Sequence, residues 1–331
     1  MTGREARAVG SEPGRGGGGG PWGVSAEAEG GAVSEAMWRA VQQGGELQEL
    51  VSEQEFARFQ ALIHREAGIW LASNKRALLA GRLARRVREL GLPSFRAYRE
   101  LVERDDAERV RMLDRITTNE THFFREPRHF EFLAGEVFPR WRAEAAEGLR
   151  PRRARIWSAA CSTGEEPYSI AMSLLRAFPP GSGWELEVLA TDLSTRVLQQ
   201  AEDAVWPIDK AVEIPEAARR AFMLRGTGPH AGIMKAGPEL RALVRFQRLN
   251  LNERAYPDIG VFDAVFCRNV FIYFDGRTKD AVTGRLLERL EPSGYLFLGH
   301  AESLSGSLHP VRGVMPTVYV HERAAPGRGP S

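Results

Sequence analysis

Hydrophobic positions recur with two different periods along this chain, and the period changes near residue 150. From about 46 to 126 the apolar residues follow helical spacing, in SEQEFARFQALIHREAG, NKRALLAGRLARRVREL, SFRAYRELV and DDAERVRMLDRITTNE. This pattern predicts an all-α N-terminal domain at 46–126. A connecting helix is expected over 127–150, where PRHFEFLAGEVFPRWRAEAAE keeps the same period.

Beyond residue 150 short apolar runs alternate with amphipathic stretches. The predicted strands are RIWSAAC, ELEVLATD, FDAVFCRNV and GYLFLGHA, and the predicted helices are EPYSIAMSLLRAF, TRVLQQAE and TKDAVTGRLLERL. Strands that alternate with helices predict a parallel sheet covered on both faces. We therefore expect a doubly wound α/β domain at 151–323.

The alternation is interrupted between about 206 and 249. Gly-x-Gly-Pro and Ala-Gly turn signals lie there between short apolar runs such as GIMK and LVRFQ. The pattern is typical of a small β insertion, either a hairpin or three strands, and it fits a plain connector equally well. An insertion of this kind would present a strand edge outward, where an extended peptide can add by main-chain hydrogen bonds.

The two ends of the chain and its composition exclude several classes of protein. Residues 1–45 are rich in Gly, Ala and Glu and predict a disordered leader, and 324–331 predict a disordered tail. The leader has no apolar signal-peptide core, and no later segment has about 18 uninterrupted apolar residues, so we expect neither secretion nor a membrane span. Cys161 and Cys267 follow apolar runs, which favours reduced thiols in a cytoplasmic protein.

The 45 basic and 43 acidic residues nearly cancel, so only local clusters of charge are informative. Between 72 and 90 there are six basic residues and one acidic residue, a local charge of +5. At about 100° per residue, one face of this helix carries Lys75, Arg82, Arg85 and Arg86. Such a face can be merely solvated, or it can contact nucleic acid or an acidic protein.

The turn SAACSTGEEPY joins the first predicted strand to its helix, where open α/β sheets bind their ligands. Gly164 would let the backbone approach a ligand, while Ser162 or Thr163 with Glu165 or Glu166 fits a capping box. The turn has neither G-x-G-x-x-G nor a P-loop lysine and is a poor pyrophosphate cradle. Its two carboxylates would favour a cation or ribose hydroxyls.

The second predicted strand ends in Asp192, at the usual position of a ribose acceptor in nucleotide sites. Asp192 could instead form an Asx turn before a helix capped by Ser194. Together the two acidic positions suggest a positively charged nucleoside ligand without a phosphate chain. S-adenosylmethionine has these properties.

Five motifs in series carry a resemblance to a known family: TTNETHFFREPRHF, WSAACSTGEEPYSIAM, ATDLS, FDAVFCRNVFIYFD and GYLFLGHAESL. In this order they resemble CheR, the family of chemotaxis receptor methyltransferases, over about 52 to 319. The resemblance implies S-adenosylmethionine-dependent methylation of glutamate side chains on bacterial chemoreceptors. It also implies which residues hold the cofactor: Asn119, Thr121, Arg125, Glu165, Asp192, Asn250, Leu251, Asn269 and Val270. The choice between Glu165 and Glu166 stays open, the other acid serving as the cap.

The implied chemistry makes few demands on the protein. The ordinary pKa of a glutamate side chain is about 4.3, so the nucleophile is already a carboxylate and no general base is needed. Accordingly, the sequence shows no Ser/His/Asp or Cys/His arrangement of recognisable spacing, and we expect no metal. Tyr273 of NVFIYFD would orient the acceptor, or it is an aromatic core residue.

The resemblance also favours particular partners. Acidic receptor helices would contact the basic face at 75–86, and RGTGPHAG resembles the loop of family members that tether a receptor C-terminal peptide by strand addition. We expect a monomer that binds no nucleic acid and does not insert into membranes. Two alternatives remain: a catalytically silent cofactor-sensing or scaffolding module, and a methyltransferase acting on RNA or a small molecule. Polar residues at the implied cofactor positions favour activity.

Overall fold

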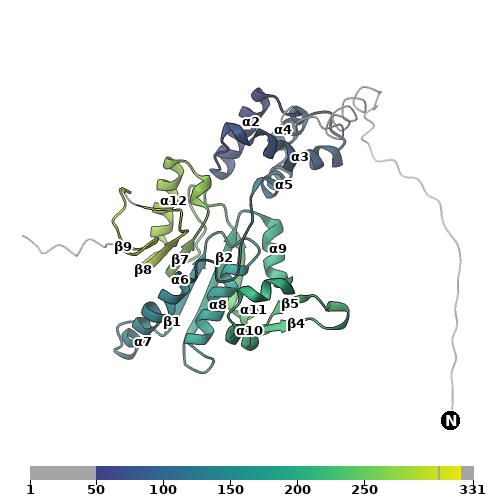
Figure 1. Cartoon of the computed structure of the whole chain (residues 1–331). Helices are drawn as coiled ribbons and strands as arrows, with labels where there is room; N and C mark the ends of the chain where they lie inside the picture. The colour runs from purple at the N-terminus through teal and green to yellow at the C-terminus, as the bar shows by residue number, and fades with distance from the viewer. Residues whose placement is uncertain (1–49, 305, 322–331) are drawn as a thin grey trace, which may run out of the picture.

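The computed structural model describes residues 50–304 and 306–321 (Figure 1). The predicted leader at 1–45 and tail at 324–331 lie outside these residues. The first elements are four helices: α2 (Glu53–Ala67), α3 (Arg76–Glu89), α4 (Phe95–Arg104) and α5 (Asp106–Ile116). None of the described helices combines the length and the apolar character that crossing a bilayer requires.

Local sequence signals set the ends of these helices. Ser52 caps α2 by accepting from the backbone N–H of Glu55, and Gly68 ends it in the left-handed conformation at φ 71°. The predicted end of this last helix, at TTNE, was wrong. α5 stops at Ile116, and Thr117 is extended at ψ 144°. β-branched Thr117 and Thr118 are poor helix formers. Residues 117–126 therefore form a loop, which lines the cavity described below.

The predicted connecting helix is interrupted by one π-helical turn. α6 (Pro127–Phe132) passes through η3 (Leu133–Val137) into α7 (Phe138–Ala146). The backbone N–H of Phe138 donates to Leu133 O, five residues earlier. Because Pro139 has no N–H to donate, the regular helical ladder fails at this point and the wider turn accommodates it.

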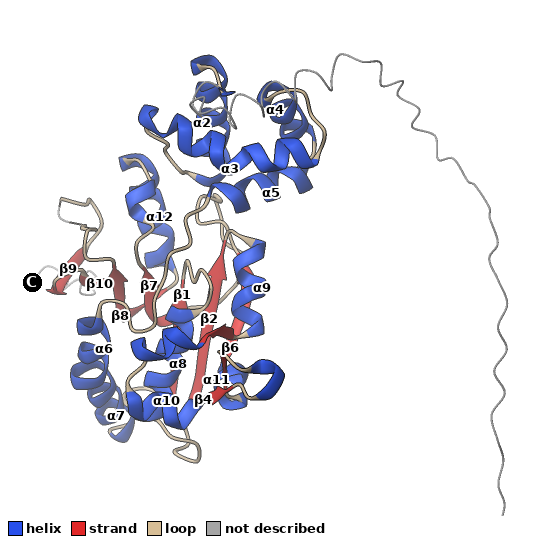
Figure 2. Ribbon diagram, turned by 45° about the vertical axis from the view of Figure 1, so that its right-hand side comes forward, coloured by secondary structure: helices blue, strands red, loops and turns tan. Residues whose placement is uncertain are grey.

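A seven-stranded sheet forms the centre of the second part of the chain (Figure 2). Its order is β6-β2-β1-β7-β8-β10-β9, and the first five strands are parallel. The strands are β1 (Arg153–Ser158), β2 (Glu185–Asp192), β6 (Val244–Arg248), β7 (Phe262–Cys267), β8 (Leu290–Leu298), β9 (Val311–Met315) and β10 (Val318–His321). The prediction of a doubly wound α/β fold is confirmed, whereas the antiparallel strands β9 and β10 were not predicted.

Both faces of the sheet are buried. On one face α6, α7 and α8 (Glu165–Ala177) pack against inward side chains such as Ile156 and Phe266. On the other, α12 (Gly276–Glu288) belongs to one apolar cluster with Trp157 and Val265. α9 (Thr195–Asp203) runs beside β2 and β6. The helices before residue 117 stand as a separate lobe beyond the carboxyl ends of the strands (Figure 1), and their buried apolar residues join the same cluster.

The insertion takes the three-stranded form of the prediction. β3 (Val205–Pro207), β5 (Ile233–Ala236) and β4 (Met223–Arg225) form a small antiparallel sheet in the order β3-β5-β4. Between and after these strands lie η4 (Ile208–Glu213), α10 (Glu216–Phe222), η5 (Gly228–His230) and α11 (Pro238–Leu243). The placement of LVRFQ in the insertion was wrong, because its Val244–Gln247 segment belongs to β6 and pairs in parallel with β2.

Candidate functional site

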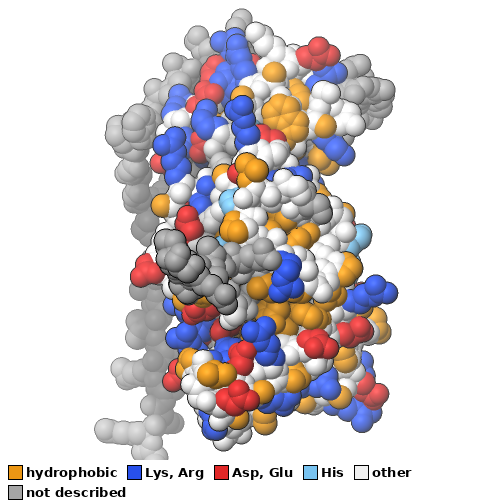
Figure 3. Space-filling model, turned by 90° about the vertical axis from the view of Figure 1, so that its left-hand side faces the viewer, with side chains coloured by type: hydrophobic (Ala, Val, Ile, Leu, Met, Phe, Trp, Pro, Cys, Tyr) orange, Lys and Arg blue, Asp and Glu red, His pale blue; other side chains and the backbone are white. Residues whose placement is uncertain are grey.

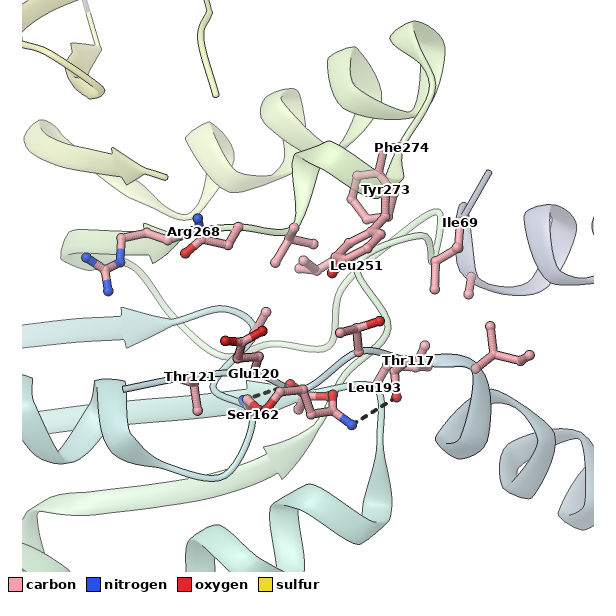
Figure 4. Close-up of a pocket in the computed structure, with 18 of the residues that line it drawn as sticks. Ile69, Thr117, Glu120, Thr121, Ser162, Leu193, Leu251, Arg268, Tyr273 and Phe274 are labelled. Carbon is pink, nitrogen blue, oxygen red and sulfur yellow. Dashed lines mark hydrogen bonds between the residues drawn. The ribbon is translucent and has the colours of Figure 1, made fainter. Parts of the chain in front are cut away.

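A cavity of about 430 Å³ lies between the carboxyl ends of the strands and the N-terminal helices (Figure 4). Ile69 from the helical part and Tyr273 and Phe274 from beyond β7 lie on one side of it, and Thr117, Ser162 and Leu193 on the other. The cavity is therefore built from segments far apart in the sequence, at the edge where an open α/β sheet binds its ligands.

The structure brings together nearly all the residues that the family resemblance implied. The cavity is lined by Asn119, Thr121, Arg125, Asp192, Asn250, Leu251, Asn269 and Val270. Glu165 does not line it, whereas Glu166 does. Of the two acids in the turn, Glu166 is therefore the one in position to touch a ligand.

The two acids take different partners. The Glu165 carboxylate is 1% exposed, is paired with Lys210, and accepts a 2.7 Å hydrogen bond from Thr163 Oγ1. Glu166 accepts from Ser158 Oγ and Arg268 Nε, both at 2.7 Å.

The expected capping box was wrong, because α8 begins after Gly164 at φ 97° without a side-chain cap. Ser162 Oγ instead donates to Asn119 O. Both glutamates serve long-range ion pairs, so neither is left to cap the helix.

Asp192 forms the Asx turn that the sequence left open, and it also lies at the cavity. Its Oδ1 accepts from Ser194 N, as in an Asx turn, and its Oδ2 accepts from Ser162 N, both at 2.9 Å. The side chain also lines the cavity. Burial raises the pKa of Asp192, and the nearby charge of Asp114 adds to this, while the two backbone donors oppose it. Each carboxylate oxygen keeps a second lone pair, with which it can accept from a ligand hydroxyl.

The asparagines of the site hold loops in place. Asn250 Nδ2 donates to Glu66 O at 2.7 Å, and its Oδ1 accepts from Asn252 N at 3.0 Å. Asn269 has a left-handed φ of 59°, and its N–H donates to Glu302 Oε2 at 2.9 Å. Asn250 therefore ties the helical part to the cavity wall, and buried Glu302 fixes the turn that follows β7.

Sequence reasoning missed a buried network of charges behind the cavity. Arg268 pairs with Glu166, lies near Glu126 and His129, and donates from Nη1 to Arg125 O at 2.6 Å. Burial and the charge of Arg268 lower the pKa of His129 to about 4. Burial would raise the pKa of Glu126, but Arg268 and hydrogen bonds from His300 lower it. The sequence did hold one signal of this network: Arg268 directly follows the apolar strand residues Phe266 and Cys267 in VFCRNV.

The predicted basic face is divided in the structure. Arg86 turns inward to the buried carboxylate of Glu108, with Nη2 at 2.6 Å from Oε2, because that carboxylate needs a counter-charge. Arg85 is exposed and pairs with Glu89 at 2.9 Å. Lys and Arg side chains gather over the helical part in Figure 3, among fewer acidic ones. Only two of the four predicted residues, Lys75 and Arg82, line the cavity.

Arg82 has neutral partners among the described residues. Its Nη1 donates to Ile116 O, and its Nη2 donates to Thr118 Oγ1 at 2.7 Å. Burial lowers the pKa of Arg82, and the neighbouring Tyr273 opposes this. Tyr273 is half-buried, lines the cavity and packs against the apolar cluster, which fits both interpretations made from the sequence.

Comparison with known proteins identifies the family. The family model of the CheR methyltransferase SAM-binding domain matches residues 119–320, and that of the CheR methyltransferase all-alpha domain matches 54–117. The chain belongs to the CheR methyltransferase family. Chemotaxis protein methyltransferase 2 of Pseudomonas aeruginosa is 40% identical over 272 residues, which are 81% of this chain and 93% of the relative. The chemotaxis protein methyltransferase of Klebsiella aerogenes is 42% identical over 257 residues, 77% of this chain and 85% of the relative.

The cavity of this CheR protein fits the cofactor of the family, S-adenosylmethionine. Its polar lining includes the carboxylates of Asp192 and Glu166 and the guanidinium of Arg125, which suit hydroxyls, an ammonium group and a carboxylate. Leu193 and Leu251 add apolar wall for a flat ring system. The SAM-binding domain supplies most of the lining, and the all-alpha domain supplies the side that includes Lys75 and Arg82.

Proposed function

We propose that this methyltransferase converts glutamate side chains of bacterial chemoreceptors to methyl esters. The supporting observation is the cationic side of the cavity, where Arg82 is held by neutral acceptors near Tyr273 and Lys75 also lines the wall. A cation without a carboxylate partner among the described residues attracts an anionic acceptor. The relatives named above are chemotaxis protein methyltransferases, which points to receptors as the source of that acceptor.

For the cofactor we assign the cavity residues according to their chemistry. Asp192 would accept from ribose hydroxyls, Glu166 would face the ammonium group, and Arg125 would pair with the carboxylate. Glu166 replaces Glu165 in this assignment, because Glu165 lies outside the cavity. The remaining members of the set supply amides, a hydroxyl and apolar wall: Asn119, Thr121, Asn250, Leu251, Asn269 and Val270.

The bound cofactor supplies an electrophilic methyl group, and the protein has to orient the acceptor. A glutamate side chain with its ordinary pKa of about 4.3 is ionised at neutral pH and attacks without a general base. Lys75 and Arg82 would draw its carboxylate into the cavity, and the Tyr273 hydroxyl would fix its direction. Residues before 117 line one side of the cavity and would limit the access of water to the reacting carboxylate.

The insertion would hold the receptor near this site. β4 is an edge strand of the small sheet, and its Leu224 is 53% exposed. The following loop is tight, since a Cβ at Gly226 would lie 1.9 Å from His230 O. We infer that this edge accepts a receptor C-terminal peptide by strand addition, which would raise the local concentration of receptor glutamates to about the millimolar range.

Transfer of labelled methyl groups tests the proposal. The protein is incubated with methyl-labelled S-adenosylmethionine and receptor cytoplasmic fragments, and the product is treated with mild base. An ester releases its label as methanol, whereas a methylated amide or amine keeps it. Fragments with the methylated glutamates changed to alanine are the matched control. Label that resists base, or label on RNA but not on the fragments, would refute glutamate methylation of receptors.

A further inference from the structure

The first turn of the insertion reaches the two loops that line the cavity. β3 and η4 contribute Trp206, Lys210 and Glu213, and each of these side chains bonds to residues 119–125 or 162–165. The loop at 119–125 carries Asn119, Thr121 and Arg125, which line the cavity, and the loop at 162–165 contributes Ser162. The start of the insertion therefore bonds to the loops that surround the expected cofactor site.

Lys210 connects the two loops directly. Its Nζ pairs with the buried Glu165 carboxylate of one loop and donates to the main-chain oxygen of Thr121 in the other, at 3.1 Å. The lysine side chain is 28% exposed and that of Glu165 only 1%. Because a carboxylate this deeply buried needs a counter-charge, Lys210 is held in one place and holds Thr121 in turn.

Glu213 and Trp206 complete the attachment. Glu213 Oε2 accepts from Phe123 N at 2.8 Å, and its Oε1 lies 2.9 Å from His122 Nδ1. Trp206 Nε1 donates to Thr163 O at 3.1 Å, and its ring packs edge-on against Phe123 with centroids 5.0 Å apart. The loop at 119–125 is thus fixed from the insertion side at two main-chain atoms, Thr121 O and Phe123 N.

We propose that Lys210 is a positioning residue for the cofactor site and that Glu165 is its counter-ion. Lys210 acts through Thr121 and does not touch the cavity itself. On the other side of the same loop, Arg268 holds Arg125 O with Glu166 as its partner. Each glutamate of the turn thus orients a cation that holds one carbonyl of this loop. The inference rests on the proposed cofactor role of residues 119–125.

Binding of S-adenosylhomocysteine, measured by calorimetry, tests Lys210→Met. We expect Kd to rise about tenfold, as for loss of one charge-assisted contact. Lys210→Arg should stay within about threefold of wild type, since it keeps the cation. Lys235→Met, at a lysine of β5 in the same insertion, is the matched control and should leave Kd unchanged. Since this assay needs no methyl acceptor, its result is independent of whether receptors are the substrate.

Hydrogen exchange of the unliganded protein is the second measurement. In Lys210→Met we expect faster exchange of the backbone amides at 119–125, with β4 and β5 unchanged. The Km for receptor fragments should also stay unchanged while that for S-adenosylmethionine rises. Should Lys210→Met fail to fold, Glu165→Gln, which removes only the counter-charge, takes its place with a rise in Kd of about threefold. Wild-type affinity and wild-type exchange at 119–125 in either variant would overturn the proposal.

Discussion

His129 should make the stability of this protein depend on pH in a predictable way. The side chain is 3% exposed, and its Nδ1 lies 3.4 Å from Glu126 Oε2 and 3.2 Å from Arg268 Nη1. Its Nε2 lies 3.0 Å from Thr317 Oγ1, and its ring packs edge-on against Phe297. Burial and the arginine outweigh the carboxylate and lower the pKa of His129 from 6.5 to about 4.

The size of the effect follows from linkage. The unfolded chain takes up a proton at His129 near pH 6.5, and the folded protein does so only near pH 4. The stability contributed by the neutral histidine is therefore present above pH 6.5 and is lost as the pH falls towards 4. Between pH 7 and pH 5 the loss in free energy of unfolding amounts to about 2 kcal/mol.

Urea unfolding followed by tryptophan fluorescence at pH 7 and pH 5 measures this loss. Other groups also titrate over this range, so the quantity of interest is the difference between wild type and His129→Gln. The variant should lose about 2 kcal/mol less stability than wild type between the two pH values. His230→Asn, at an exposed histidine of η5, should behave as wild type. Equal pH dependence in wild type and His129→Gln would refute the buried neutral histidine.

Three further variants probe the site. Asp192→Asn should raise the Kd for S-adenosylhomocysteine roughly ten- to hundredfold in calorimetry, with the melting temperature reporting any loosening at Ser162 and Ser194. Arg82→Ala should raise the Km for receptor fragments, most at low salt, whereas Arg85→Ala should change it little because Arg85 points to Glu89 and not to the cavity. Shortening the loop at 225–232 should slow methylation of receptors that carry the C-terminal peptide, and methylation of saturating isolated fragments should continue at the normal rate.

The spacing of apolar residues predicted the helices and strands whose positions depend on neighbouring residues alone. The alternation of strands and helices predicted β1, α8 and β2 at nearly their observed positions. The strands β9 and β10 were missed because each is five residues or shorter and only partly buried, so neither has a clear hydrophobic period.

The roles of the two acids depend on distant residues. Glu165 and Glu166 have the same local context, and only their partners, 45 and 102 residues further along the chain, distinguish them. For the same reason the sequence predicted too many residues on the basic face. Arg86 leaves this face to pair with Glu108, which lies on another helix.

The apolar cluster shared by the N-terminal helices and the sheet bears on how such chains can be recombined. Leu83 and Tyr98 of the all-alpha domain belong to the same cluster as Trp157 and Leu286 of the SAM-binding domain. A chimera that joins the helices of one relative to the sheet of another would bring together two half-cores that were never fitted to each other. Although two family models describe the sequence, natural variants in the helices and in the part of the sheet domain that they contact should be inherited as matched sets.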